Sequence, residues 1–185
     1  TAIIRGLQGG STGEIGPQSV MATLKHLGGH GASEGGLNRS PAHIGPIELR
    51  ETHLVPFATI IRNARPAAVM PAYNEVDGIP PHADRALLQD LVRGEYGFNG
   101  LFVSDYDAVG HLFKDHRVVA TAAEAARLAL ESGVQLELPV PETFSQLIPL
   151  LGTDPALEKL VDDAVRAVLR WKFQLGLFEE KPLDA

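Results

Sequence analysis

The chain has 185 residues, of which 44% are hydrophobic, so it can bury a core and is expected to form one domain. Its formal net charge is -7 and it has no cluster of Lys and Arg, which argues against nucleic acid and anionic membranes as partners. It has no cysteine, which excludes disulfides and thiolate metal sites, and no apolar run approaches the ~20 residues that span a bilayer.

The first third of the chain predicts a strand, a loop and a helix. Apolar residues within 18–24 lead into Lys25 and His26, which we place where a strand meets its loop. The segment 28–38 is too rich in glycine for a regular element. Residues 47–63 carry apolar side chains at helical spacing, which predicts a helix, and Pro56 is expected to bend it.

The rest of the chain alternates short apolar runs with amphipathic segments. The runs predict strands over 67–70, 101–105 and 134–139, and the amphipathic segments predict helices over 83–95, 121–132 and 157–175. In the last helix we expect an inward face made of Leu160, Val161, Val165, Val168, Leu169 and Phe173. Strands that alternate with helices indicate βα units, a parallel sheet and right-handed crossovers. About four such units predict an α/β fold that forms half of a TIM-type (β/α)8 barrel.

The strand over 101–105 ends in the most informative residues of the chain. An apolar run stops abruptly at Ser104 and Asp105, and a second acidic residue, Asp107, follows. A buried strand that delivers a carboxylate to the surface is how many barrel enzymes build an active site. On these residues alone, a role for Asp105 in capping a turn or helix fits equally well.

Other chemistries have weaker signals in the sequence. Ser104 lacks the Gly-x-Ser-x-Gly pattern of a serine hydrolase, and no strand is followed by the Gly-x-Gly-x-x-Gly start of a dinucleotide-binding helix. His26 and His30 have the spacing of a metal pair, but the glycines between them oppose the helix that such a pair usually requires, so we expect no metal site. Asn38 and Arg39 lie in the glycine-rich loop, where a solvated loop is the simpler interpretation than contact with a substrate.

An ordered set of motifs over nearly the whole chain resembles glycoside hydrolase family 3. The motifs are Lys25-His26-Leu27-Gly28-Gly29-His30-Gly31, Glu48-Leu49-Arg50-Glu51, Val69-Met70-Pro71-Ala72-Tyr73-Asn74, Gly97-Phe98-Asn99-Gly100 before Val103-Ser104-Asp105, and the closing segment from Val168 to Phe178. The resemblance implies that residues 1–185 are about the C-terminal half of the family's N-terminal (β/α)8 barrel domain, without the second domain.

The resemblance also assigns roles to site residues. Asp105 corresponds to the family's nucleophile, and Lys25 and His26 to donors that hold hydroxyl groups of the sugar in the first subsite and help keep the carboxylate ionised. Tyr73 corresponds to a tyrosine near the nucleophile, where a phenol can hydrogen-bond the carboxylate. Tyr106 stands where many members carry tryptophan, which implies a place on the aglycone side. Without the resemblance, Lys25 and His26 would be an exposed lysine beside a packed histidine, and Tyr73 a core aromatic.

The implied activity is that of a retaining exo-acting β-glycosidase, a β-glucosidase or a related enzyme. Such an enzyme hydrolyses a terminal non-reducing β-linked sugar of an oligosaccharide or β-glucoside through a covalent glycosyl-aspartate. Two carboxyl groups and water are sufficient for this reaction, so no cofactor is implied. The loop over 32–41 lacks the Asp-Ser-His pattern of the family's β-N-acetylglucosaminidases, which favours the β-glucosidase-like interpretation.

Several parts of the family's machinery lie outside this sequence. The first-subsite aspartate and arginine come from upstream motifs and the general acid/base commonly comes from a second domain, while neither Glu75 nor Glu137 has a motif that identifies it as a replacement. Gln135 stands where the family often has aspartate. The chain opens at Thr1 without Met or a signal-peptide pattern, so we expect the natural N-terminus to be missing, and the compartment is left open. We therefore expect the rest of the barrel and the second domain as partners and no activity without them; the alternative is a noncatalytic carbohydrate-binding or assembly fragment.

Overall fold

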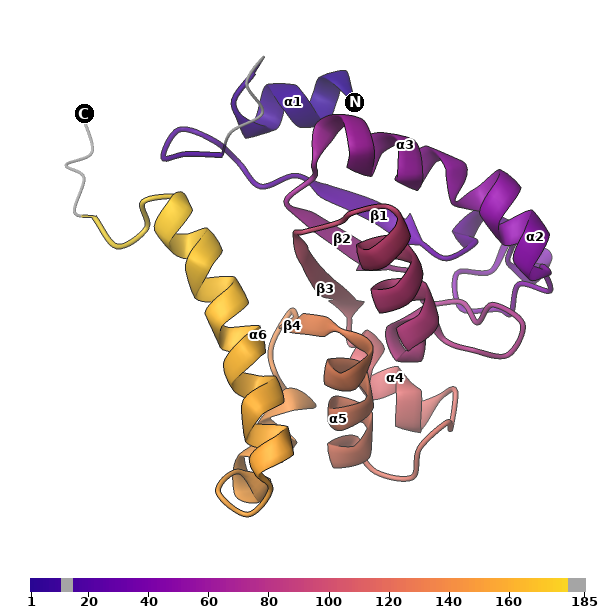
Figure 1. The fold of residues 1–185 in the computed structure, drawn as a ribbon. Helices are drawn as coiled ribbons and strands as arrows, with labels where there is room; N and C mark the ends of the chain where they lie inside the picture. The colour runs from indigo at the N-terminus through magenta and orange to yellow at the C-terminus, as the bar shows by residue number, and fades with distance from the viewer. Residues whose placement is uncertain (11–14, 180–185) are drawn as a thin grey trace.

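One parallel sheet organises the computed structural model, which describes residues 1–10 and 15–179 (Figure 1). Its strands follow the order of the chain: β1 (Thr23–Leu27), β2 (Ala68–Pro71), β3 (Leu101–Tyr106) and β4 (Val134–Leu138). The α-helices are α1 (Ala2–Gln8), α2 (Pro46–Glu48), α3 (Val55–Ala64), α4 (Ala108–Lys114), α5 (Ala122–Ser132) and α6 (Pro155–Gln174). Tighter or wider helical turns are η1 (His30–Ala32), η2 (Glu34–Gly36), η3 (Leu49–His53), η4 (Pro81–Ala83), η5 (Ala86–Glu95) and η6 (Phe144–Leu150). The predicted α/β fold of parallel βα units is confirmed.

Alternate residues of the strands point to opposite faces of the sheet. On one face, Leu27, Val69, Phe102 and Val134 join the main core under the helices that connect the strands. On the other face, strand residues such as Met70 and Val103 pack with Val168 and Trp171 of α6. Figure 1 shows this division, with α6 on one side of the sheet and α3 on the other. In a closed barrel the second face would be the interior.

The first strand starts later than predicted. β1 spans Thr23–Leu27, so Lys25 and His26 lie within the strand and not after it. The earlier apolar residue Val20 is 61% exposed, and its N–H donates to the Leu7 carbonyl of α1 instead of to a strand. The correction moves the carboxyl end of β1, where loops begin, to Gly28.

The helix predicted over 47–63 is broken into α2, η3 and α3. Pro56 lies in the first turn of α3, where its missing N–H costs no internal hydrogen bond. The helix therefore restarts beside Pro56 and does not bend there. Leu54 and Ile61 are buried as the pattern predicts. The segment predicted as a helix over 83–95 forms η4 and then η5, whose hydrogen bonds have π-helical spacing, and its apolar face is buried as expected.

The helix predicted over 121–132 is confirmed as α5. Thr121 accepts a hydrogen bond from the N–H of Glu124, and the Glu124 carboxylate accepts one from the N–H of Thr121, which forms a capping box. Gly133 ends α5 with a φ of 109°, and a Cβ there would lie 1.7 Å from the amide nitrogen of Gln89. Both the backbone and the space therefore require glycine at this position.

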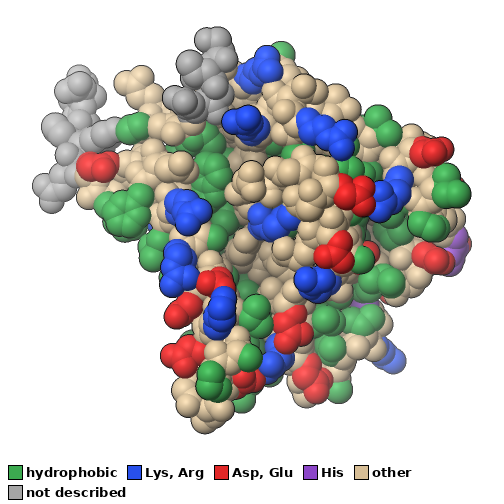
Figure 2. Space-filling view, in the orientation of Figure 1, with side chains coloured by type: hydrophobic (Ala, Val, Ile, Leu, Met, Phe, Trp, Pro, Cys, Tyr) green, Lys and Arg blue, Asp and Glu red, His purple; other side chains and the backbone are tan. Residues whose placement is uncertain are grey.

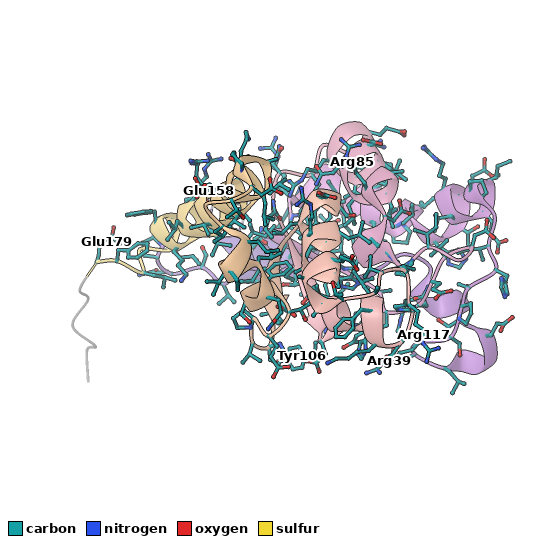
Figure 3. The ribbon with its side chains drawn as sticks, turned by 90° about the horizontal axis from the view of Figure 1, so that it is seen from below. Arg39, Arg85, Tyr106, Arg117, Glu158 and Glu179 are labelled. Atoms are coloured by element: carbon teal, nitrogen blue, oxygen red, sulfur yellow. The ribbon has the colours of Figure 1, made fainter. Side chains whose placement is uncertain are left out.

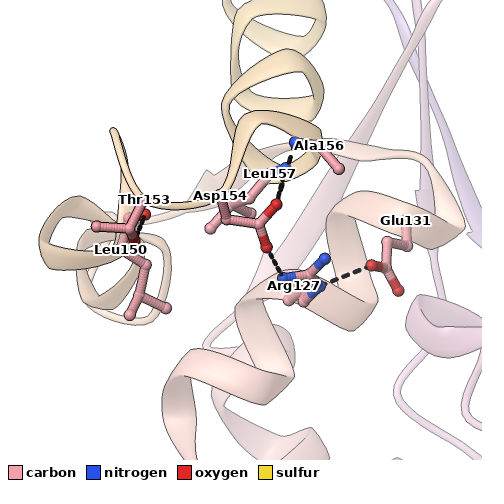
Figure 4. Close-up of polar contacts among 7 residues, drawn as sticks. All are labelled: Arg127, Glu131, Leu150, Thr153, Asp154, Ala156 and Leu157. Carbon is pink, nitrogen blue, oxygen red and sulfur yellow. Dashed lines mark hydrogen bonds and ion pairs between the residues drawn. The ribbon is translucent and has the colours of Figure 1, made fainter.

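The last helix, α6, is longer than predicted and is packed differently. Asp154 caps it by accepting hydrogen bonds from the N–H groups of Ala156 and Leu157, and Arg127 of α5 holds the same carboxylate (Figure 4). The expected inward face is only partly correct, because Val165 is 50% and Phe173 is 62% exposed. The buried residues of α6 are Leu157 and Ala164 instead. The sheet ends at β4, so no strand lies opposite the outer half of the predicted face among the described residues, where Phe173 contacts the ring of Phe178.

The surface carries charges of both signs. Figure 2 shows acidic and basic side chains interspersed over α6 on the face in view, and not a basic patch there. Among the helices of the described residues, none is long and apolar enough to cross a membrane.

Candidate active site

The carboxyl end of β3 carries two polar side chains, Ser104 and Asp105, with different surroundings. Ser104 is fully buried, and its hydroxyl accepts a hydrogen bond of 2.8 Å from the N–H of Leu138 in β4. Asp105, the next residue, faces the edge of the sheet with 13% of its side chain exposed. The Ser104 hydroxyl therefore links β3 to β4, while the Asp105 carboxylate is close to solvent. The serine-hydrolase alternative has no support in this geometry.

Side chains from the ends of β1 and β2 converge on the Asp105 carboxylate. Tyr73 donates its hydroxyl proton to Oδ1 at 3.0 Å, and the N–H of Tyr106 donates to the same oxygen at 2.8 Å. Oδ2 lies 3.2 Å from Nε2 of His26. Because these contacts come from the ends of three strands, the carboxylate is held in one orientation without being enclosed.

Tyr73 lies between the carboxylate and the loops around it. Its hydroxyl has one proton and two acceptors, Asp105 Oδ1 and the Tyr106 carbonyl at 2.7 Å. Burial, and next the hydrogen bond to Asp105, raise the pKa of Tyr73 well above its ordinary value. The phenol is therefore a proton donor that stays protonated. The guanidinium of Arg39 lies 5.3 Å from the centre of its ring, and His111 meets the ring edge-on.

Lys25 and His26 are neighbours in β1 with different environments. Lys25 is exposed, whereas His26 is partly buried and lies at an irregularity of the pairing with β2, between Lys25 and Leu27. Desolvation lowers the pKa of His26, which outweighs the opposite effect of Asp105, and the charge of Lys25 lowers it further. A neutral His26 with a proton on Nε2 donates to Asp105 Oδ2. Its ring lies 4.7 Å from that of His30, which is exposed.

Tyr106 contributes its backbone to the site and its ring to the rim. The side chain is 57% exposed, while its N–H and carbonyl both serve the group around Asp105. Figure 3 shows Tyr106, Arg39 and Arg117 along the same edge of the molecule. Of the residues expected at the site, the structure brings together Asp105, His26, Tyr73 and Tyr106, and Lys25 lies beside His26.

Three contacts near the site have no counterpart in the predicted set. His82 is buried and accepts a hydrogen bond from the N–H of Asp105 at 3.2 Å. Glu75 meets Nδ1 of His116 at 2.8 Å. Arg39, expected in a solvated loop, forms an ion pair with Asp115 at 3.3 Å besides covering Tyr73. The only signal for His82 in the sequence is its place directly after a Pro-Pro turn that follows β2.

The polar side chains of β4 accept hydrogen bonds from backbone N–H groups. Gln135 accepts a hydrogen bond from the N–H of Phe102 at 2.8 Å, which ties β4 to β3. Glu137 is buried and accepts hydrogen bonds from the N–H groups of Thr143 and Phe144. The end of β4 therefore holds the following loop and directs no carboxylate at Asp105. Within the described residues, no group of three or more His, Asp or Glu side chains is arranged to hold a metal ion.

The fold and the site define a barrel-type α/β protein with one carboxylate held by tyrosine and histidine at the carboxyl edge of its sheet. Residues 1–171 match the model of the glycosyl hydrolase family 3 N terminal domain, so the chain belongs to this family. The resemblance found in the sequence is thereby confirmed.

Named relatives show what the chain is similar to. It is 35% identical to a β-xylosidase of Formosa agariphila over 98% of this chain and 26% of that protein. It is 34% identical to a periplasmic β-glucosidase of Salmonella typhimurium over 96% of this chain and 22% of that protein. The structure of the β-glucosidase EmGH1 from Erythrobacter marinus superposes with a TM-score of 0.87 at 37% identity, over 96% of this chain and 24% of that one. A mutant β-glucosidase from Listeria innocua in complex with laminaribiose gives 0.83 at 33% identity, over 96% and 24%. The chain spans about a quarter of the length of these proteins.

Proposed function

We propose that residues 1–185 are about the C-terminal half of a family 3 N-terminal barrel domain and contribute the nucleophile of a retaining exo-acting β-glycosidase. The observation that carries the proposal is the convergence of Tyr73 and His26 on Asp105, from strands that precede it in the sheet. The names of the relatives, which are β-glucosidases and β-xylosidases, support a terminal β-linked sugar as the substrate.

The proposed reaction forms and then breaks one ester. Asp105 attacks the anomeric carbon while the bond from that carbon to the leaving oxygen breaks, and a general acid supplied by another part of the enzyme protonates the leaving oxygen. Water then adds to the anomeric carbon as the glycosyl-aspartate bond breaks. The group that acted as the acid takes a proton from this water, and the Asp105 carboxylate is restored. The attacking atom is Oδ2, since Oδ1 already accepts two hydrogen bonds and Oδ2 has only the longer contact with His26.

The neighbours of Asp105 have distinct roles in this proposal. Tyr73 and the N–H of Tyr106 hold Oδ1, which keeps Oδ2 directed at the sugar. When Oδ1 loses its charge in the ester, the Tyr73 hydroxyl has a second acceptor in the Tyr106 carbonyl. Lys25 and His26 face hydroxyl groups of the sugar in the first subsite, and the exposed ring of Tyr106 lines the side of the leaving group.

The proposal also assigns partners to the open parts of the fold. β1 and β4 lie at the two ends of the sheet, so each has an edge that pairs with no strand among the described residues. Beside β4, α6 exposes the stripe Val165, Leu169 and Phe173. We propose that the rest of the enzyme covers this stripe and pairs with the open strand edges, and that a second domain completes the site with the acid/base group.

The test is trapping of the protein, as its gene encodes it, with a 2-fluoro β-glucoside that carries a good leaving group, followed by peptide mapping. We expect one label per active site, on Asp105. A label on another residue would overturn the assignment of the nucleophile. Sugar binding without any label or turnover would favour a noncatalytic carbohydrate-binding role instead.

A further inference from the structure

His82 lies between the ends of β2 and β3, behind the carboxylate. It belongs to η4, the single turn that follows Pro80, and only 2% of its surface is exposed. A fully buried imidazole needs a partner for each ring nitrogen, because an unsatisfied polar atom in a core is costly. The two partners of His82 show what it does.

The first partner is the backbone of the nucleophile itself. The ladder between β2 and β3 pairs Ala68 with Leu101 and Val69 with Phe102, while β3 continues to Tyr106. Beyond Phe102 the two strands diverge, and the N–H of Asp105 donates to Nε2 of His82 at 3.2 Å. The imidazole thus takes the place that a strand carbonyl would have in the ladder.

The second partner fixes which ring nitrogen carries the proton. Nε2 accepts a hydrogen bond, so in the neutral ring the proton is on Nδ1, and the ring donates it to the carbonyl of Ala72. The N–H of Ala72 in turn donates to the carbonyl of Leu27 at 2.7 Å. One chain of hydrogen bonds therefore joins the ends of β1, β2 and β3, and it ends at Asp105.

We propose that His82 is a positioning residue for Asp105, which acts as a neutral Nδ1–H imidazole that replaces the missing ladder partner and sets the backbone from which the carboxylate extends. The proposal rests on the proposed function of Asp105 as the nucleophile. The orientation matters because a nucleophile displaced by about 1 Å can lose about 100-fold in rate. His82 does not touch the sugar, so its effect is on the rate of attack and not on sugar binding.

Two amide variants separate the two hydrogen bonds. In His82→Gln the side-chain oxygen reaches the position of Nε2 and can accept from Asp105, whereas His82→Asn places its amide near Nδ1 and can only replace the bond to Ala72. In the protein as its gene encodes it, we expect His82→Asn to lower kcat on an aryl β-glucoside by about 10- to 100-fold. His82→Gln should stay within about 3-fold of the parent, and both should bind the competitive ligand gluconolactone as the parent does. Equal losses in the two variants, or no loss in either, would overturn the proposal.

A measurement on the unaltered protein covers the case in which the variants do not fold. Nitrogen NMR of protein labelled only at histidine should show one ring that stays neutral at pH 6 with its proton on Nδ1, and this signal should disappear in any His82 variant that does fold. A charged ring, or a proton on Nε2, contradicts the proposal. The variant Asp105→Asn distinguishes a failure of the proposed function from a failure of the role of His82. Full turnover in Asp105→Asn would refute the proposed function. Inactivity of Asp105→Asn together with equal kcat values in His82→Asn and His82→Gln would refute only the role of His82.

Discussion

The ends of β3 and β4 carry the same type of group and use it in opposite ways. The Asp105 carboxylate receives side-chain contacts from two other strands and keeps 13% of its side chain exposed. The Glu137 carboxylate is buried and accepts hydrogen bonds from two N–H groups of its own following loop. The Asp105 carboxylate remains accessible to a ligand, whereas the Glu137 carboxylate stabilises the loop that follows β4.

The difference teaches that the partners of a carboxylate, and not its place at a strand end, decide its chemistry. Backbone donors from a loop bind both oxygens of Glu137, which leaves no atom free to attack. Donors from Tyr73 and Tyr106 bind only Oδ1 of Asp105. The predictions below begin with this contrast and continue with the elements around it.

The largest expected effect comes from exchanging each carboxylate for its amide. Asp105→Asn should lower kcat on an aryl β-glucoside by roughly 10⁴-fold or more, because an amide is not a nucleophile for the anomeric carbon. Glu137→Gln should keep kcat within about 10-fold and instead lower the free energy of unfolding by about 1–3 kcal/mol, since a buried acceptor of backbone N–H groups is replaced. Steady-state kinetics and thermal unfolding of both variants check this, and a catalytic loss in Glu137→Gln as large as that in Asp105→Asn would remove the contrast.

The next effect concerns the donor to Oδ1. Tyr73→Phe removes the hydroxyl that holds the carboxylate and should lower kcat by about 100-fold, as expected for the loss of one preorganised donor. Tyr96→Phe is the matched control, because Tyr96 precedes β3 at the other end of the sheet and is also partly buried. Kinetics on the same substrate measure both variants. Equal activity of the two would show that the phenol at Asp105 is only a packing group.

The stability that His82 contributes at the ends of β2 and β3 should depend on pH. Burial lowers the pKa of His82 to about 3. Between that value and the ordinary value near 6.5 the unfolded chain binds a proton that the folded chain does not, so stability falls as pH falls, by up to about 1.4 kcal/mol per pH unit. The thermal midpoints of the parent and of His82→Gln should therefore differ less at pH 5.0 than at pH 7.5.

The smallest effect tests whether the surface beside β4 is covered in the whole protein. Val165 of α6 and Val55 of α3 are similarly exposed here, at 50% and 47%. If the rest of the enzyme covers the stripe on α6, Val165→Ala should lower the free energy of unfolding by about 1 kcal/mol in the protein as its gene encodes it. Val55→Ala should be close to neutral. A neutral or stabilising Val165→Ala, as expected from the helix propensity of alanine on an open surface, would contradict the proposed covering of the stripe.

Much of the fold could be predicted because it follows from local patterns. The strands around Val69 and Phe102 and the helix over 121–132 lie close to where the sequence predicts them. The inward face of α6 was only partly correct. Its helical period shows which side chains share a face, but whether Phe173 on that face is buried depends on which element lies opposite it.

The sequence by itself determined the βα alternation, the family, and Asp105 as the carboxylate at a buried strand end. Each of these follows from residues that are close together in the sequence. Only the tertiary structure showed that His82 supports the backbone of Asp105 from 23 positions away, and that Arg39 joins Asp115 across 76 positions. It also decided that Glu137 binds a loop while Asp105 stays accessible. The physical reason is that parallel strands bring distant segments to one edge, and the partners that meet there depend on where each strand stops pairing.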